Sequence, residues 1–381
     1  MPEHCRVGLI GQRFMGRAHS NAYRQASKFF ALPLVPELHT VAANDDASLA
    51  EFASRWGWPN RTTDWRELAA NDELDLIDVA TPNHLHLEPS ALSLEAGKHV
   101  ACEKPLANDL AGARTLRDAA AKSDSQTFVW FNYRRCPAVA LAYRHLRDGR
   151  LGAIRHVRAR YLQSWGEATT PTSWRFRAAE AGSGAHGDLN AHIVDLCRFL
   201  TGEEIVEVHG ATTRTFVEER LDPESGQRVK SDVDDATLFL AQLSGGGVAS
   251  FEATRVAPGH LNDNGIEING ERGSLRFEFE DMNRLHLFDA EENPGTAGWR
   301  SVICTDGEHH PYVGAWWPEG HVIGYEHGFV NMVADMMRAI AGEEPEVPLP
   351  SFEDGYQVQR VLEAALVSAR ERCAVALDEV R

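Results

Sequence analysis

Three features that mark other classes of protein are missing from this chain of 381 residues. No apolar run reaches the roughly 18 residues that a membrane-spanning helix requires, and the first residues lack the basic and apolar segments of a secretory signal peptide. Lysine and arginine form no dense block, and the formal charge of −18 argues against nucleic acid or an anionic membrane as a partner. We therefore expect a cytoplasmic protein that acts on a small molecule.

Cysteine is also sparse, and its spacing is uninformative for metal binding. The six cysteines form no CxxC pair, which argues against both a zinc knuckle and a disulfide framework. Reduced thiols in a cytosol fit this pattern best.

The sequence is too long for one hydrophobic core, so we expect two domains, and after Arg155 its pattern changes to strands rich in Val, Thr and Arg. Short apolar runs alternate with helical patterns before that point, which predicts an α/β Rossmann domain with a doubly wound parallel sheet in residues 1–134. Its strands are expected at 7–10, 40–43, 76–80, 99–102 and 127–131, and its helices at 47–56, 65–70, 86–96 and 111–121.

The remainder, residues 135–381, is rich in Val, Thr and Arg runs joined by glycine turns. This pattern predicts an α+β domain with a large, mostly antiparallel open sheet. Strands are expected at 156–162, 206–215, 236–243, 247–254, 265–269, 274–278 and 284–288, and helices at 187–200, 325–341 and 352–373. We expect part of the last helical section to pack back on the first domain.

A glycine turn follows the first predicted strand and opens a helix. Its sequence is Gly11-Gln12-Arg13-Phe14-Met15-Gly16, a stretched relative of the dinucleotide fingerprint, in which glycine lets backbone N–H groups approach a pyrophosphate. The second strand leads into Asn44 and Asp45, and an acid there binds ribose hydroxyls, so NAD is favoured over NADP. We expect an extra loop at Lys28 to Pro36, which leaves the choice between Asn44 and Asp45 open.

Two polar loops follow later strands, at the sheet edge where such folds bind ligands. The first is Thr81-Pro82-Asn83-His84-Leu85-His86, from which Asn83 and His86 are expected to line the cofactor channel. The second is Glu103-Lys104-Pro105, in which proline restrains the backbone and the ammonium is directed into the crevice. A surface salt bridge is the structural alternative for this lysine.

A glycine-rich segment, Gly182 to Gly187, runs into a predicted helix that carries Asp188, His192 and Asp195. Their spacing of four and three residues puts all three on one face. An Asp-x-x-x-His pair at helical spacing can also bind a metal, but we favour a catalytic role for this pair and predict no metal site.

In combination, these motifs resemble those of the glucose-fructose oxidoreductase and inositol dehydrogenase family, Gfo/Idh/MocA, over essentially the whole chain. The resemblance implies that Lys104, Asp188 and His192 are the catalytic residues. In that interpretation His192 is the general base, Lys104 stabilises the developing alkoxide, and Asp188 holds the reacting hydroxyls. The segment Phe29 to Leu34 is similar to the branch that contains levoglucosan dehydrogenase, which hints at a pyranoside substrate.

Further contacts are expected around this set. Cofactor contacts are predicted for Gly11, Gln12, Arg13, Phe14, Met15, Asn44, Asp45, Thr81, Pro82, Asn83, His86, Glu103, Lys104, Asn132, Arg134, Trp174 and Arg175. Substrate contacts are predicted for Lys104, Tyr133, Trp165, Asp188, His192 and His327.

The leading functional hypothesis is an NAD-dependent dehydrogenase that acts on a secondary ring hydroxyl of a sugar, glycoside, anhydrosugar or cyclitol. An alternative is a glycoside hydrolase that oxidises a sugar carbon transiently, eliminates the aglycone and reduces the product again. A third is a non-catalytic NAD-binding regulator, against which the presence of Lys104 and His192 argues. The resemblance also implies a homo-oligomer, a dimer or tetramer formed through the open face of the second sheet.

Overall fold

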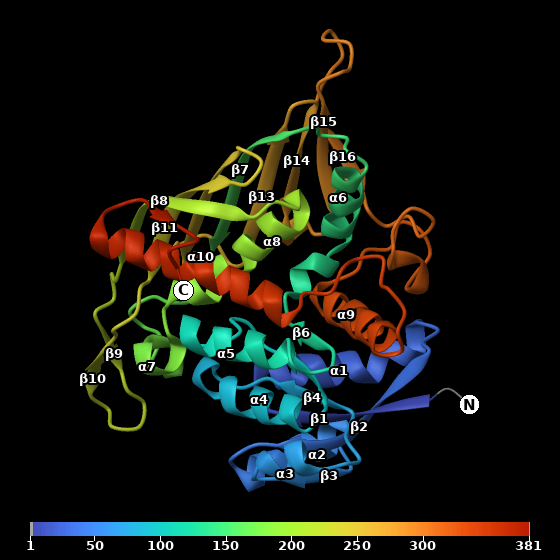
Figure 1. The fold of residues 1–381 in the computed structure, drawn as a ribbon, viewed down its shortest axis with the longest axis vertical. Coiled ribbons are helices and arrows are strands. Elements are labelled where there is room, and N and C mark those ends of the chain that lie inside the picture. The colour runs from blue at the N-terminus through green and yellow to red at the C-terminus, as the bar shows by residue number, and fades with distance from the viewer. Residues whose placement is uncertain (1–2, 381) are drawn as a thin grey trace. The chain divides into compact units, whose positions relative to one another are not determined.

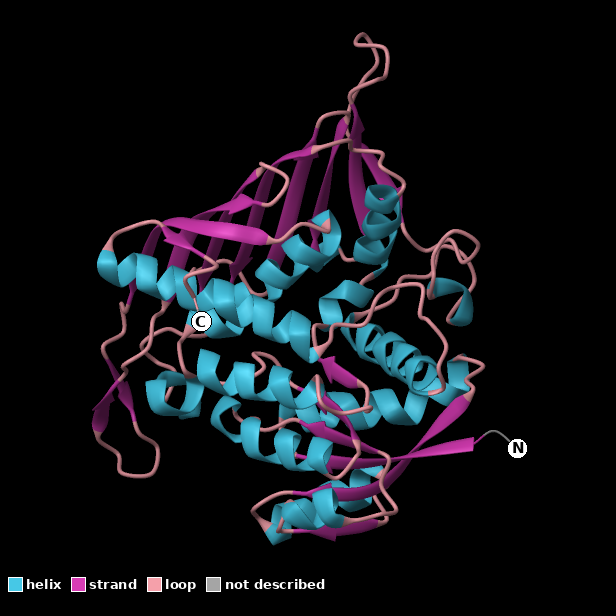
Figure 2. Ribbon diagram, in the orientation of Figure 1, coloured by secondary structure: helices cyan, strands magenta, loops and turns pink. Residues whose placement is uncertain are grey.

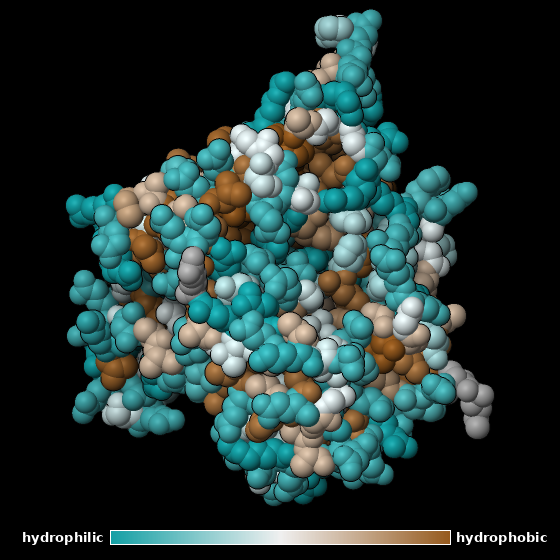
Figure 3. Space-filling view, viewed as in Figure 1, coloured by the Kyte–Doolittle hydropathy of each residue, from teal (hydrophilic) through white to brown (hydrophobic). Residues whose placement is uncertain are grey.

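The structure, a computed structural model, describes residues 3–380, which cluster into two compact units. Unit 1 contains the chain up to Arg135 together with Pro311–Pro318 and Ile323–Tyr356. Unit 2 contains Cys136–His310, Glu319–Val322 and the chain from Gln357 onward. Hydrophilic residues dominate the molecular face shown in Figure 3, with apolar patches scattered among them. Within residues 3–380 no helix has both the length and the apolarity needed to cross a membrane.

Unit 1 is built on a six-stranded sheet in the order β3-β2-β1-β4-β5-β6, with every neighbouring pair parallel (Figure 1). The strands are β1 (Glu3–Ile10), β2 (Leu34–Ala42), β3 (Asn60–Thr62), β4 (Leu76–Val79), β5 (His99–Cys102) and β6 (Thr127–Val129). Val7, Leu9, Ile77 and Val79 are all 0% exposed, as expected for parallel strands covered on both faces. The predicted doubly wound sheet is confirmed, although the short β3 was not predicted.

The helices of unit 1 follow the predicted pattern closely. They are α1 (Phe14–Phe29), α2 (Asp46–Trp56), α3 (Arg66–Ala70), α4 (Leu87–Glu95), α5 (Leu110–Ala120) and α9 (Tyr325–Ile340). The long C-terminal helix α9 packs on α1, and Phe14 and Tyr325 stack with their ring planes 5° apart. Part of the last helical section of the chain therefore belongs to unit 1.

One prediction in this unit was wrong. We expected an extra loop at Lys28 to Pro36, but α1 runs to Phe29 and β2 begins at Leu34, so that only residues 30–33 connect them. The unusual length of this βαβ unit therefore comes from a longer helix and a longer strand. Lys28 lies in the last turn of α1, where a cation is favourable.

Unit 2 is built on a nine-stranded sheet in the order β16-β15-β14-β13-β7-β12-β11-β8-β17, shown as strands in Figure 2. Only the pair β7 and β12 is parallel among these described strands, which confirms the prediction of a mostly antiparallel sheet. The strands are β7 (Ile154–Leu162), β8 (Ile205–Arg214), β11 (Ala236–Leu243), β12 (Val248–Thr254), β13 (Asp263–Gly270), β14 (Gly273–Glu278), β15 (Arg284–Asp289), β16 (Arg300–Ile303) and β17 (Val375–Ala376). A separate hairpin consists of β9 (Glu219–Leu221) and β10 (Arg228–Lys230).

Helices cover one face of this sheet. The helices not yet described are α6 (Pro137–Arg147), α7 (Ala178–Ala181), α8 (Ala191–Thr201) and α10 (Phe352–Glu371), of which α10 begins in unit 1. Contacts join α8 to β7 and β13, and α6 to β14 and β15. Ala159, Phe239 and Phe251 point into this covered side and are at most 4% exposed. The residues before and after each of them along the strand point to the opposite face of the sheet.

Candidate active site

The two glycine positions of the turn in unit 1 leave no room for a side chain. Gly11 has φ +115°, its N–H donates to the Ala42 carbonyl at 2.9 Å, and a Cβ on it would lie 2.4 Å from the Ala80 carbonyl oxygen. A Cβ on Gly16 would lie 2.3 Å from the Gly11 carbonyl oxygen. Both positions thus require glycine, because the turn draws the ends of β1 and β4 against the start of α1.

The N-terminus of α1 is suited to an anion. Its first turn contains no acidic residue, no side chain caps it, and the exposed Arg13 precedes it. Unpaired N–H groups, the positive end of the helix dipole and this guanidinium favour a phosphate. The turn therefore fits the pyrophosphate of NAD.

The acidic residue after β2 already has a structural partner. Asp45 caps α2, because its Oδ1 accepts hydrogen bonds from the Ser48 backbone N–H at 2.8 Å and from the Ser48 hydroxyl at 2.7 Å. These bonds lower the pKa of Asp45. Gln12 donates to the same hydroxyl at 2.8 Å, which ties the glycine turn to α2. Asn44 and Asp45 are both exposed, so both remain candidates for the ribose.

The loops after β4 and β5 are joined by a buried histidine. His86 is 0% exposed, and its ring nitrogens lie 2.9 Å from the carbonyl oxygens of Pro105 and Thr81. Burial lowers the pKa of this imidazole. We predicted that its side chain lines a cofactor channel, whereas the structure shows it holding the two loops by their backbones. Lys104, in the loop so held, is half-buried, and Asn83 is 7% exposed.

The predicted residues after β6 are buried more deeply than a loop at a site edge would suggest. Asn132, Tyr133 and Arg134 are 3–5% exposed in the 3-10 turn η2 (Asn132–Arg135). The Arg134 guanidinium lies 3.4 Å from a carboxylate oxygen of Asp354.

His327, at the start of α9, accepts the Gly324 backbone N–H at 3.1 Å and packs against Trp316, with ring centroids 4.4 Å apart. Pro82 and Thr81 are half-buried beside the glycine turn, and Met15 is half-buried within it.

In unit 2 the glycine-rich segment leads into a π-helix (His186–Asn190) and then into α8, where a regular helix was predicted. Asp234 explains the change, since its two carboxylate oxygens accept the backbone N–H groups of Gly184 at 2.7 Å and His186 at 2.8 Å. A Cβ on Gly184 would lie 1.7 Å from the Asp234 carbonyl oxygen. The segment is therefore glycine-rich because a strand end passes directly against it. Such π-turns occur frequently at functional sites.

Asp188 projects from this π-helix and is held by a residue that the sequence did not single out. Arg255, which follows β12 and is 2% exposed, donates to Asp188 Oδ2 at 2.9 Å and to the Arg175 carbonyl at 3.3 Å. Its guanidinium also lies 5.0 Å from the centre of the Trp165 ring. An arginine alone in a strand-rich region carries no sequence signal, so only the fold reveals this partner.

A chain of contacts continues from Trp165 to His192. The Trp165 indole N–H donates to Gln163, and the Asn262 amide oxygen accepts from Gln163 and from the Tyr161 hydroxyl, both at 2.7 Å. The Tyr161 ring lies 5.8 Å from the His192 ring. We call the seven residues connected in this way the unit 2 polar cluster: Asp188, Arg255, Trp165, Gln163, Asn262, Tyr161 and His192. Trp174 and Arg175 lie nearby in sequence, half-buried, with the Arg175 guanidinium 4.4 Å from the centre of the Trp174 ring.

The predicted catalytic residues thus fall in both units. Asp188 and His192 belong to the polar cluster of unit 2, whereas Lys104 belongs to unit 1 with the glycine turn. Among residues 3–380, no group of three or more His, Cys, Asp or Glu side chains is arranged to hold a metal ion.

Comparison with known proteins gives a consistent assignment. Residues 5–131 match an oxidoreductase family with an NAD-binding Rossmann fold, and residues 139–276 match the GFO/IDH/MocA C-terminal domain. A levoglucosan dehydrogenase of Pseudarthrobacter phenanthrenivorans is 37% identical over 99% of this chain and 99% of its own. The crystal structure of an oxidoreductase domain protein from Kribbella flavida shares 50% identity, with a TM-score of 0.94 over 98% of this chain and 99% of its own.

A levoglucosan dehydrogenase solved in complex with NADH and levoglucosan shares 38% identity, with a TM-score of 0.93 over 98% of this chain and 100% of its own. The resemblance inferred from the motifs, including its levoglucosan-dehydrogenase-like branch, is confirmed. This chain belongs to the Gfo/Idh/MocA family of NAD-binding oxidoreductases.

Proposed function

We propose that this protein is an NAD-dependent dehydrogenase that oxidises a secondary ring hydroxyl of a sugar, glycoside, anhydrosugar or cyclitol. The observation that carries the proposal is the unit 2 polar cluster, in which a carboxylate, a guanidinium, two amides and an indole ring are linked by direct contacts. A sugar presents hydroxyls at its edges and C–H groups on its faces, so it needs such polar groups together with an aromatic surface. The levoglucosan dehydrogenase relatives support a pyranose ring as the substrate.

The cofactor is proposed to bind to unit 1. The turn Gly11–Gly16 and the N-terminus of α1 would hold the pyrophosphate, and Asn44 or Asp45 would accept the ribose hydroxyls. When bound, NAD supplies a hydride acceptor for the substrate carbon. An acidic side chain beside the ribose disfavours a 2′-phosphate, which supports NAD over NADP.

The chain's own side chains perform the acid–base work. His192 would take the hydroxyl proton on an imidazole nitrogen, because a histidine ordinarily changes charge near neutral pH. The Lys104 ammonium would donate a hydrogen bond to the same oxygen and stabilise the negative charge that develops on it. Asp188, oriented by Arg255, would accept hydrogen bonds from neighbouring hydroxyls and fix the ring.

The proposal is tested by incubating the enzyme with levoglucosan, glucose, glucosides and myo-inositol in the presence of NAD or NADP. Net accumulation of NADH with an intact sugar skeleton is expected. Aglycone release from a glucoside without net NADH would instead support the redox-neutral glycosidase, and no turnover despite nucleotide binding would support the regulator. The relatives named above are dehydrogenases or oxidoreductases, which favours the first outcome.

Two substitutions test the catalytic assignment. Lys104→Met and His192→Asn should each lower kcat by about 100-fold or more, because each removes a group that acts on the reacting oxygen. The Kd for NAD should change less than about threefold, since neither group is proposed to hold the pyrophosphate. The exposed Lys122 and His309 provide matched controls, as Lys122→Met and His309→Asn should retain wild-type kcat. Wild-type turnover in either test variant would contradict the role given to that residue.

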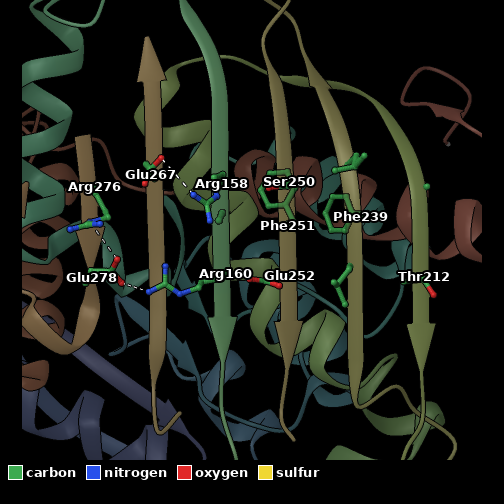
Figure 4. A pocket seen from close by; sticks show the side chains of 14 residues that line it. Arg158, Arg160, Thr212, Phe239, Ser250, Phe251, Glu252, Glu267, Arg276 and Glu278 are labelled. Atoms are coloured by element: carbon green, nitrogen blue, oxygen red, sulfur yellow. Dashed lines mark hydrogen bonds and ion pairs between the residues drawn. The ribbon is translucent and has the colours of Figure 1, made fainter. Parts of the chain in front are cut away.

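We also propose that two copies pair through the open face of the unit 2 sheet. Figure 4 shows this face, where a concavity of about 680 Å³ is lined by two ion-paired rows, Arg158 with Glu267 and Arg160 with Glu278. Leu238 and Leu240 are 41% and 55% exposed beside them. A face with both charge signs and an apolar strip can meet a copy of itself about a two-fold axis.

Light scattering after gel filtration tests this pairing. The wild type is expected to elute as a dimer or tetramer, and Leu240→Asp should shift it to smaller species because a carboxylate would be buried in the interface. Leu261→Asp is the control, since Leu261 is 78% exposed and lies outside the concavity. A monomeric wild type would contradict the proposal.

The compartment proposed is the cytoplasm. All six cysteines are unpaired, and five of them are buried, which fits an environment that keeps thiols reduced. Fractionation of the source cells with an antibody would test this.

A further inference from the structure

A buried histidine lies between two carboxylates in unit 1. His19, on α1, is 0% exposed; its Nδ1 lies 3.2 Å from Asp78 Oδ1, and its Nε2 lies 3.1 Å from Glu103 Oε1. An ionised carboxylate can only accept hydrogen bonds, so two such partners call for a ring that donates from both nitrogens. The arrangement is that of an imidazolium shared by two acids.

One of these acids also holds the loop of Lys104. Glu103 is 5% exposed, and its second oxygen, Oε2, accepts the backbone N–H of Lys104 at 3.1 Å. His19 and the Lys104 backbone are therefore bound to opposite ends of one carboxylate. Because α1 begins at the glycine turn, this carboxylate joins the phosphate-binding helix to the loop of the lysine.

The second acid is fixed just as firmly. Asp78 is 0% exposed, and its Oδ1 accepts the indole N–H of Trp130 at 3.0 Å. The Trp130 ring stacks on the imidazole with a centroid distance of 3.9 Å, and Phe329 of α9 packs against the imidazole at 5.7 Å. Residues in β4, at the ends of β5 and β6 and on α9 thus enclose the ring.

Other titratable groups that face these acids favour their neutral forms. Tyr23 on α1 has its pKa raised by burial and by Asp78, and Cys102 on β5 has its pKa raised by burial. Cys5 on β1, beside Tyr23, has its pKa raised to about 12 by burial, and burial lowers the pKa of His86 near Glu103. Two carboxylates in this pocket therefore depend on His19 for a facing positive charge.

We propose that His19 is a positioning residue for the Lys104 loop: its imidazolium neutralises and orients the Glu103 carboxylate, which in turn fixes the backbone of Lys104. The inference rests on the proposed function, in which Lys104 acts on the substrate oxygen. Burial by itself would lower the pKa of His19, but Asp78 and Glu103 outweigh it and raise the pKa to about 9, so the ring carries its charge at neutral pH. No contact between His19 and the substrate is required.

The test uses His19→Gln, Glu103→Gln, the double variant and a control, His99→Gln. Glutamine keeps a donor at position 19 but no charge, which leaves two buried carboxylates to repel each other or take up a proton. The expected result for His19→Gln is a kcat lower by about 100-fold with a nearly unchanged Kd for NAD, because a misplaced catalytic group costs about that much. His99 lies at the opposite end of β5, where it accepts the Gln126 backbone N–H at 2.9 Å, so His99→Gln should keep the wild-type kcat.

The double variant separates positioning from packing. If His19 acts through the charge of Glu103, His19→Gln/Glu103→Gln should be no slower than the slower single variant. Losses that multiply would show two independent roles and overturn the inference. A kcat for His19→Gln equal to that of His99→Gln would also overturn it.

A titration of the protein without substrate gives a second readout. Tryptophan fluorescence should change with a midpoint near pH 9 as the ring stacked on Trp130 loses its proton, and this transition should be absent from His19→Gln. If the variant does not fold, the titration of the wild type is used alone. A fluorescence midpoint below pH 7 would refute a charged His19 between Asp78 and Glu103. Lys104→Met is measured in parallel: if it keeps its kcat, the catalytic role proposed for Lys104 fails, whereas if it loses kcat and His19→Gln does not, only the positioning role of His19 fails.

Discussion

The charge on His19 should make unit 1 lose stability in mildly alkaline solution. Histidine has a pKa of 6.5 in its unperturbed state and about 9 here, so the folded protein holds this proton more tightly than the unfolded chain does. For a raised pKa the stabilisation is complete below pH 6.5 and disappears as the pH rises through 9. A difference of 2.5 pKa units between these two values corresponds to about 3 kcal/mol, half of which is gone near the middle of that window. The ring is 0% exposed, so solvent screening does not reduce this figure.

The assay is urea unfolding of the wild type and of His19→Gln at intervals between pH 6 and 10. Hydrogen exchange of the buried amides of β4 and β5 reports unit 1 by itself. The difference in unfolding free energy between the two proteins should shrink by about 3 kcal/mol across the range, because the wild type loses the stabilising proton of His19, which the variant does not have. A difference that stays constant, or that grows with pH, would refute the argument that His19 is charged between Asp78 and Glu103.

Two further substitutions address the two binding surfaces. Gly11→Ala should raise the Kd for NAD at least about tenfold and lower the stability of unit 1 by about 1–3 kcal/mol. The reason is that φ at this position is +115° and the new Cβ would lie 2.4 Å from the Ala80 carbonyl oxygen. Calorimetry measures the Kd, and thermal unfolding measures the stability. Arg255→Met should raise the sugar KM about tenfold or more with an unchanged Kd for NAD, because Asp188 loses the guanidinium that orients it. The sugar KM is measured by steady-state kinetics with each substrate varied in turn.

Each of these has its own control and its own contradicting result. Gly97 also has a positive φ, but nothing lies within 4 Å of a Cβ placed there, so Gly97→Ala isolates the backbone cost from the clash. Equal effects of the two glycine variants on NAD binding would contradict the close-approach argument. Arg228→Met, on the exposed hairpin, is the control for Arg255→Met. If the sugar KM of Arg255→Met is as unchanged as that of Arg228→Met, Arg255 does not orient Asp188 for substrate binding.

The motif residues of unit 1 could be located from the sequence because their requirements are local. Glycine at positions 11 and 16 reflects a tight turn after a strand, and proline at 105 follows a lysine at a strand end. Alternating apolar runs were sufficient to predict five of the six strands and the parallel sheet. The length of α1 was not predicted, because the segment from Phe29 to Pro36 is apolar throughout and shows neither a helical nor a strand period, so only packing decides where the helix ends.

Tertiary structure alone decided which side chains are partners. Arg255 reaches Asp188 across 67 positions of sequence, and Glu103 reaches His19 across 84. Neither pair leaves a periodic or spaced pattern, since each joins elements that the sheets bring together. His86 shows the same limit, because a histidine in a polar loop suggests contact with a ligand until the fold shows it buried between two carbonyl oxygens. Sequence determined where chemistry-bearing residues stand along the strands, while the fold determined which charges they face, because burial and distance set the energy of a charge.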